Sequence, residues 1–73
     1  METMETAIEI TVNGETRSAK SGATVSDLLQ QLGLSSGRVA IERNRDILPR
    51  PQWAATQVQP GDHYEIVQFV GGG

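Results

Sequence analysis

The chain has 73 residues, a net charge of −3, no cysteine and a single histidine, His63. This composition excludes disulfides and thiolate metal sites, and one histidine cannot build a zinc site without several carboxylates. Only six residues are Lys or Arg, which argues against nucleic-acid binding, and the apolar runs are too short for a membrane span. We therefore expect one small cytoplasmic domain that is stabilised by its core alone and holds no metal.

The first expected unit is a β-hairpin that follows a short acidic leader. Residues 1–6 lack the basic-then-apolar order of a signal peptide and are expected to be a flexible leader. From residue 7 to 13, apolar and polar side chains alternate with the period of a strand that has one buried face. Asn13-Gly14 favours a type I′ turn, because both central residues of that turn need positive φ. Residues 15–19 then return as a polar edge strand.

A capped helix is expected next. Thr24 is a favourable N-cap, and Asp27 can interact with the helix N-terminus. Gly33 supplies the left-handed residue that ends many helices, and Leu34 supplies the hydrophobic contact of a Schellman ending. The pattern predicts a helix of about nine residues. Its apolar stripe has helical spacing and consists of Val25, Leu28, Leu29 and Leu32.

The second half of the chain is expected to hold two longer strands and a folded connection between them. Trp53 should pack inward from this connection, and Pro60-Gly61 favours a type II turn before the last strand. In chain order, we predict a strand at 38–43, a turn at 44–46, a very short strand at 47–48, a helical turn at 51–56 and a strand at 63–70.

These elements predict an α+β fold in which one helix covers a mixed sheet of four or five strands. The first and last strands are the most apolar, so we expect them to be parallel neighbours at the centre of the sheet. The single domain should span 7–70, followed by a flexible glycine tail at 71–73.

The end of the sequence points to function, because good strand formers lead directly into Gly71, Gly72 and Gly73. Glycine permits close approach of backbone to a ligand, and three extended residues reach about 10 Å. One interpretation is that Gly71 and Gly72 thread a narrow active site of a partner, which acts on the carboxylate of Gly73. A carboxylate is a poor electrophile, so it would need activation, most simply by adenylation with ATP. An ordinary loose chain end is the alternative interpretation.

The remaining side chains suggest a protein substrate and not an enzyme. There is no Ser/His/Asp set, phosphate-binding glycine loop or metal-ligand spacing, so no catalytic residue is assigned. Val67, Phe69 and Val70 carry the apolar run up to the tail. They are candidates for partner docking if the outer face of the last strand is exposed, and a loop of the chain covering that face is the alternative. Four acidic residues are interpreted as solvated charges: Glu42, Asp46, Asp62 and Glu65.

Nearly all of residues 7–73 resemble the ThiS family, the sulfur carriers of bacterial thiamin biosynthesis. Arg45 departs from the family pattern, which often has glycine after Asn44, and so does the leader at 1–6. The resemblance implies a β-grasp, or ubiquitin-like, roll. The residues that carry it are the ending from Glu65 to Gly73, the turn Pro60-Gly61-Asp62, the segment Val12-Asn13-Gly14-Glu15, the helix from Thr24 to Leu34, and the pattern Asn44, Pro49-Arg50 and Trp53.

The resemblance also implies a mechanism in which partner enzymes act on Gly73. A ThiF-like adenylyltransferase would use ATP to form an acyl-adenylate, and sulfur supplied by a cysteine desulfurase as a persulfide would replace AMP. A ThiG-like thiazole synthase would take sulfur from the resulting thiocarboxylate, and the chain itself would bind no cofactor. Two alternatives are the small sulfur-carrier subunit of molybdopterin synthase and an unmodified ubiquitin-like interaction module.

Overall fold

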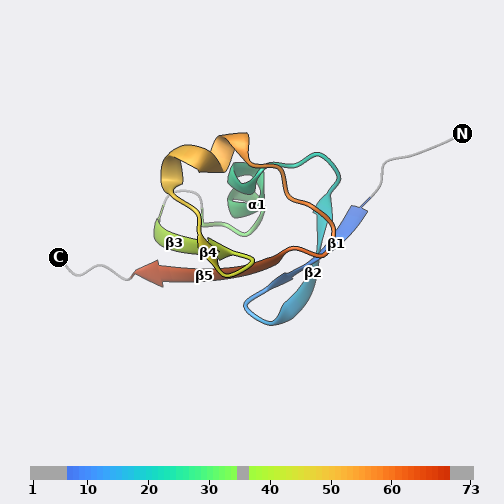
Figure 1. Cartoon of the computed structure of the whole chain (residues 1–73), viewed down its shortest axis with the longest axis horizontal. Coiled ribbons are helices and arrows are strands. Elements are labelled where there is room, and N and C mark those ends of the chain that lie inside the picture. The colour runs from blue at the N-terminus through green and yellow to red at the C-terminus, as the bar shows by residue number, and fades with distance from the viewer. Residues whose placement is uncertain (1–6, 35–36, 70–73) are drawn as a thin grey trace, which may run out of the picture.

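Five strands form one mixed sheet in the computed structural model, which describes residues 7–34 and 37–69 (Figure 1). The order across the sheet is β2-β1-β5-β3-β4. β1 and β5 are parallel, and the other neighbouring strands are antiparallel. The predicted parallel pair inside a mixed sheet is therefore confirmed. The strands are β1 (Ala7–Val12), β2 (Glu15–Lys20), β3 (Arg38–Arg43), β4 (Asp46–Ile47) and β5 (His63–Phe69).

Several expectations fall on residues that the structure does not describe. They are the leader at 1–6, Val70 as the last residue of the final strand, and the glycine tail at 71–73. β5 is described as far as Phe69.

Asn13 contributes both to the first turn and to the pairing of β1 with β5. Asn13 and Gly14 have φ values of 51° and 83°, as the predicted type I′ turn requires. The Oδ1 atom of Asn13 accepts a hydrogen bond from the Ile66 amide at 2.8 Å, and its Nδ2 atom donates to the Ile66 carbonyl at 3.1 Å. These bonds extend the attachment of β5 past the last ladder pair, Val12 and Tyr64.

The helix α1 (Val25–Gln31) begins with the expected cap. The Asp27 amide donates to Oγ1 of Thr24 at 3.2 Å, and the Thr24 amide donates to Oδ2 of Asp27 at 3.0 Å. This reciprocal capping box satisfies two backbone donors that the first helical turn would otherwise leave free. Val25, Leu28 and Leu29 are buried, so the apolar stripe faces the core.

The C-terminal end of α1 is the predicted Schellman motif. Gly33 has a φ of 77°, and its amide donates to the Gln30 carbonyl, while the Leu34 amide donates to the Leu29 carbonyl at 2.8 Å. The helix has seven residues and not about nine, because Leu32 is already its C-cap: the Leu32 amide still donates to the Leu28 carbonyl, but the backbone leaves the helix at Gly33. Within the described residues, no helix has the length and apolarity to cross a bilayer.

The core lies between one face of the sheet and the layer formed by α1 and the 3₁₀ helix η1 (Arg50–Ala55) (Figure 1). η1 takes the place of the predicted helical turn, and Trp53 packs inward from it with Nε1 donating to the Leu48 carbonyl at 2.8 Å. Burying one large apolar side chain contributes about 1.5–3 kcal/mol, so this cluster is the main source of stability. The largest fully buried side chains are Tyr64, Ile10, Leu28, Leu29, Ile41 and Val25.

The hairpin between β3 and β4 contains a strained residue. β4 lies one residue earlier than predicted, because Arg43 pairs with Asp46 and leaves a two-residue turn at Asn44-Arg45. Both turn residues have positive φ, 52° for Asn44 and 75° for Arg45. Asparagine tolerates this left-handed region, but most other non-glycine residues destabilise the folded state by about 1–2 kcal/mol when they adopt it.

Replacing Arg45 by glycine is therefore expected to stabilise the protein. Glycine removes the steric penalty at φ 75° but adds freedom to the unfolded chain, so the expected net gain in the free energy of unfolding is about 0.5–1 kcal/mol. Chemical denaturation monitored by Trp53 fluorescence measures it. Arg45→Ala is the matched control, since it removes the same side chain and keeps the strain. An equal gain in both variants would contradict the backbone explanation.

Candidate functional site

β5 is the strand from which the predicted tail continues, and it is held on both sides. β3 pairs with it from Tyr64 through Phe69, and β1 pairs with its first residues. Phe69, the last described residue of the strand, lies opposite Arg38. The carrier role of Gly73 and the threading role of Gly71 and Gly72 concern residues outside the described ranges and stay predictions.

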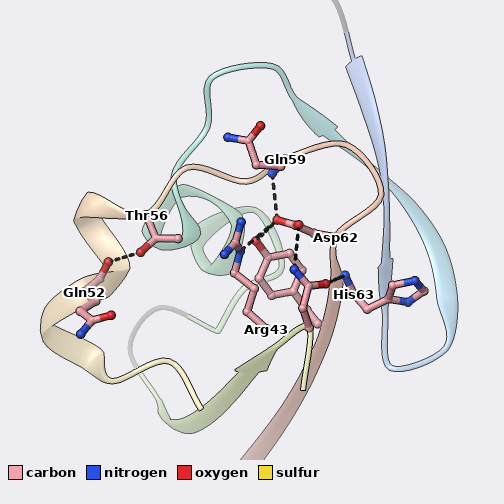
Figure 2. Close-up of polar contacts among 8 residues, drawn as sticks. Arg43, Gln52, Thr56, Gln59, Asp62 and His63 are labelled. Carbon is pink, nitrogen blue, oxygen red and sulfur yellow. Dashed lines mark hydrogen bonds and ion pairs between the residues drawn. The ribbon is translucent and has the colours of Figure 1, made fainter. Parts of the chain in front are cut away.

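A buried carboxylate anchors the beginning of β5. Asp62 is 5% exposed, and its Oδ2 atom accepts hydrogen bonds from the Gln59 amide at 2.9 Å, the Tyr64 hydroxyl at 2.8 Å and Nε of Arg43 at 3.1 Å (Figure 2). Its Oδ1 atom accepts from Nδ2 of Asn44 at 3.2 Å. The interpretation of Asp62 as a solvated charge is therefore wrong. Asp62 closes the predicted type II turn, in which Gly61 has a φ of 83° and the Asp62 amide donates to the Gln59 carbonyl at 3.1 Å. Four donors converge on its carboxylate.

These contacts fix the charge states of the cluster. Burial alone would raise the pKa of Asp62, but the hydrogen bonds from Gln59, Tyr64, Asn44 and Arg43 outweigh it and hold this pKa below its ordinary value. Burial, and then the neighbouring Asp62, raise the pKa of Tyr64 to about 12, against the opposing effect of Arg43. Burial works to lower the pKa of Arg43, but hydrogen bonds to Tyr64 and Asp62 overcome it and raise the pKa. None of the three groups changes charge near neutral pH, so the cluster is structural.

Asn44 connects this cluster to the backbone of β5. The Oδ1 atom of its side chain accepts a hydrogen bond from the His63 backbone amide at 2.9 Å (Figure 2). Its backbone amide donates to the His63 carbonyl at 2.8 Å. The His63 side chain is exposed at the beginning of the strand. The first residue of β5 is therefore held in place by hydrogen bonds at both its backbone amide and its carbonyl.

The outer face of the sheet carries exposed apolar side chains. Val67 and Phe69 are each 55% exposed, and Ile47 on β4 is 76% exposed. These exposed fractions show that no described loop covers these side chains, and α1 and η1 both lie on the opposite side of the sheet (Figure 1). The docking role assigned to Val67, Phe69 and Val70 stays a prediction, with Val70 outside the described residues.

The arrangement of one helix across a five-stranded mixed sheet with a central parallel pair defines the β-grasp, or ubiquitin-like, class. A profile of the ThiS family matches residues 8–73. The sulfur carrier protein ThiS of Escherichia coli K12 is 36% identical over 66 residues, which cover 90% of this chain and 100% of that protein. The chain belongs to the ThiS family.

Two further comparisons extend this result. The crystal structure of the thiamine biosynthesis protein ThiS from Geobacter metallireducens has a TM-score of 0.76 at 33% identity, and the match covers 90% of this chain and 100% of that one. The β-grasp fold predicted from the sequence is thereby confirmed. A thiazole synthase of Paramagnetospirillum magneticum is 44% identical over 66 residues, which cover 90% of this chain. The chain spans only 20% of the length of that synthase.

Proposed function

We propose that the chain carries sulfur for thiazole formation in thiamin biosynthesis, as a thiocarboxylate on Gly73. The observation that supports this most directly is the match to the E. coli sulfur carrier over the whole length of that protein. The family profile also extends through residue 73, so the glycine tail belongs to the shared pattern. The described body of the chain supplies a fixed base for that tail at β5.

The proposed chemistry takes place on partner enzymes. A ThiF-like adenylyltransferase joins the Gly73 carboxylate to the α-phosphate of ATP and releases pyrophosphate. The acyl-adenylate is an electrophile, whereas the free carboxylate is not. A persulfide formed by a cysteine desulfurase attacks the carbonyl carbon and displaces AMP. Reduction of the remaining S–S bond by a thiol then leaves the thiocarboxylate on Gly73.

A ThiG-like thiazole synthase is the proposed acceptor of the sulfur. Support comes from the P. magneticum thiazole synthase, in which a segment of the same polypeptide resembles this chain. A carrier and a synthase in one molecule meet at a high effective concentration, which suits a transfer between them. ATP belongs to the adenylyltransferase in this scheme, and the carrier contributes only its tail and its docking face.

Mass spectrometry of the intact protein tests the proposal. The chain is incubated with ATP, a ThiF-like adenylyltransferase, a cysteine desulfurase and cysteine. We expect one oxygen of the terminal carboxyl to be replaced by sulfur. Protein that stays unmodified would instead indicate an interaction module. The destination of the sulfur is tested by growth: a deletion strain rescued by the thiazole supports this proposal, and one rescued only by molybdopterin contradicts it.

Phe69→Ser is expected to weaken adenylation without unfolding the protein. Phe69 is 55% exposed, so its truncation removes little buried area, while loss of an aromatic docking residue should raise the KM for the carrier about tenfold. Initial rates of pyrophosphate release against carrier concentration measure this. Gln68→Ser is the matched control on the same strand, because neighbouring strand residues point to opposite faces. Adenylation kinetics that are unchanged in Phe69→Ser would refute a docking role.

A further inference from the structure

The outer face of the sheet contains an apolar groove of about 170 Å³ between β3, β4 and β5. Cavities of ~150 Å³ lined by apolar side chains can hold a benzene molecule, so the groove has room for one large apolar side chain. Ile47 and Val67 form its most exposed walls. The residues that line the groove are Ala40, Ile41, Glu42, Ile47, Glu65 and Val67.

Two carboxylates stand directly beside this groove. Glu42 and Glu65 are paired residues of β3 and β5, and both are exposed. They also line an adjoining open hollow of about 650 Å³, together with Asn44, Arg45 and His63. In the described part of the chain, neither glutamate takes part in an ion pair, and the two ion pairs seen there involve Glu15 and Asp62. Like charges placed opposite each other destabilise a sheet, so the free chain loses stability by this arrangement.

The two carboxylates disfavour a second copy of this chain as the occupant of the groove. In a symmetric dimer the same patch meets itself, so Glu42 and Glu65 of one copy would face the glutamates of the other. Such like-charge contacts oppose association, whereas a cation on a different protein would neutralise them. The groove and the two carboxylates together therefore favour a partner whose surface presents an apolar side chain with a Lys or Arg next to it.

We propose that the face formed by Glu42, Ile47, Glu65 and Val67 binds the adenylyltransferase, which places an apolar side chain in the groove and a Lys or Arg between the two carboxylates. This inference rests on the proposed function. An enzyme that binds ATP and a carboxylate needs cationic groups around its site, and an acidic face on the carrier is attracted to such a surface. β5 contributes both Glu65 and Val67, so a protein bound at the groove contacts the strand that directly precedes the predicted tail in the sequence.

The double variant Glu42→Gln/Glu65→Gln tests this inference. We expect the KM for the carrier in adenylation to rise about tenfold, with kcat unchanged. The KM of the variant should also increase less with ionic strength than the KM of the wild type. The free energy of unfolding should stay the same or rise, because the substitution removes a repulsion. Binding and stability are thus predicted to change in opposite directions, which a loss of folding cannot produce. Ile47→Ser should raise the KM by a similar factor through the apolar contact.

Glu9→Gln is the matched control, since Glu9 is an exposed glutamate on β1, outside both the groove and the hollow. A KM in the double variant equal to that of the control would overturn the inference while the proposed function stands. A wild-type chain that is never adenylated would overturn the proposed function and the inference with it. Wild-type dimers in sedimentation that Ile47→Ser abolishes would assign the groove to a second copy, which also overturns the inference.

Discussion

Deletion of Gly73 is expected to reduce kcat/KM for adenylation by at least about 100-fold. The deletion moves the terminal carboxylate back by one residue, about 3.3–3.6 Å in an extended chain. Misplacement of a reacting group by even 1 Å can lower a rate by roughly 100-fold. Adding one alanine after Gly73 should have an equal or larger effect, because the new carboxylate would lie beyond the α-phosphate of ATP and the methyl group would enter the narrow active site proposed for the partner. Pyrophosphate release and intact mass after the sulfur transfer reaction measure both effects.

The stability of the shortened chain should be unchanged, which separates chemistry from folding. Glycine has no side chain to bury, and the twelve buried apolar residues found within 7–34 and 37–69 lie between Ile10 and Ile66. Deletion of Met1 is the matched control, since it also removes one residue from a chain end and should leave adenylation intact. If the chain without Gly73 were adenylated at the normal rate, the proposal that a partner reads the position of this carboxylate would be wrong.

The sequence was sufficient where local chemistry determines the structure. Thr24 and Asp27 at the beginning of α1, and Gly33 and Leu34 after its end, form caps whose partners lie within a few residues, and both caps are confirmed. The Asn13-Gly14 turn belongs to the same class, because its positive φ values depend on two residues only. The length of α1 was overestimated, since the apolar period includes Leu32 and Leu32 is the C-cap, after which Gly33 takes the backbone out of the helix.

The cluster around Asp62 could not be read from periodicity, because its donors come from distant parts of the chain. Arg43 and Asn44 lie 19 and 18 residues before Asp62, and no local rule relates these positions. Asp62 and Glu65 therefore looked alike in the sequence, although one is buried and the other is exposed. The only signal was the resemblance to the ThiS family, which included the Pro60-Gly61-Asp62 turn without giving its role.

The second function of Asn13 was missed for the same reason. Its turn propensity is a property of two neighbouring residues, but its hydrogen bonds to Ile66 span 53 residues. The groove on the outer face also depends on tertiary structure, because Ile47 and Val67 meet only through the pairing of β3 with both β4 and β5. An exposed outer face was one of two alternatives that the sequence left open.

Asp62→Asn is expected to lower the free energy of unfolding by about 3 kcal/mol, because it removes one partner of a buried ion pair and places an amide donor against other donors. For a domain of this size the melting temperature should fall by about 12–24 °C. Tyr64→Phe is the matched control at the same cluster. It removes only the hydroxyl that donates to Asp62 at 2.8 Å and should lower the free energy of unfolding by about 1 kcal/mol. Thermal and chemical denaturation measure both values.

The effect of Asp62→Asn should also depend on pH in a defined direction. The pKa of Asp62 is lower in the folded protein than in the unfolded chain, where an aspartate has a pKa of about 3.9. The folded state therefore favours the ionised carboxylate, and this stabilisation is fully present above the unfolded pKa. It is lost as the pH falls through the folded pKa, because both states are then protonated. Urea denaturation of the wild type and of Asp62→Asn should show a constant difference near pH 7 that shrinks below about pH 4. A difference that grows on acidification would mean that the hydrogen bonds to Asp62 do not favour its ionised form.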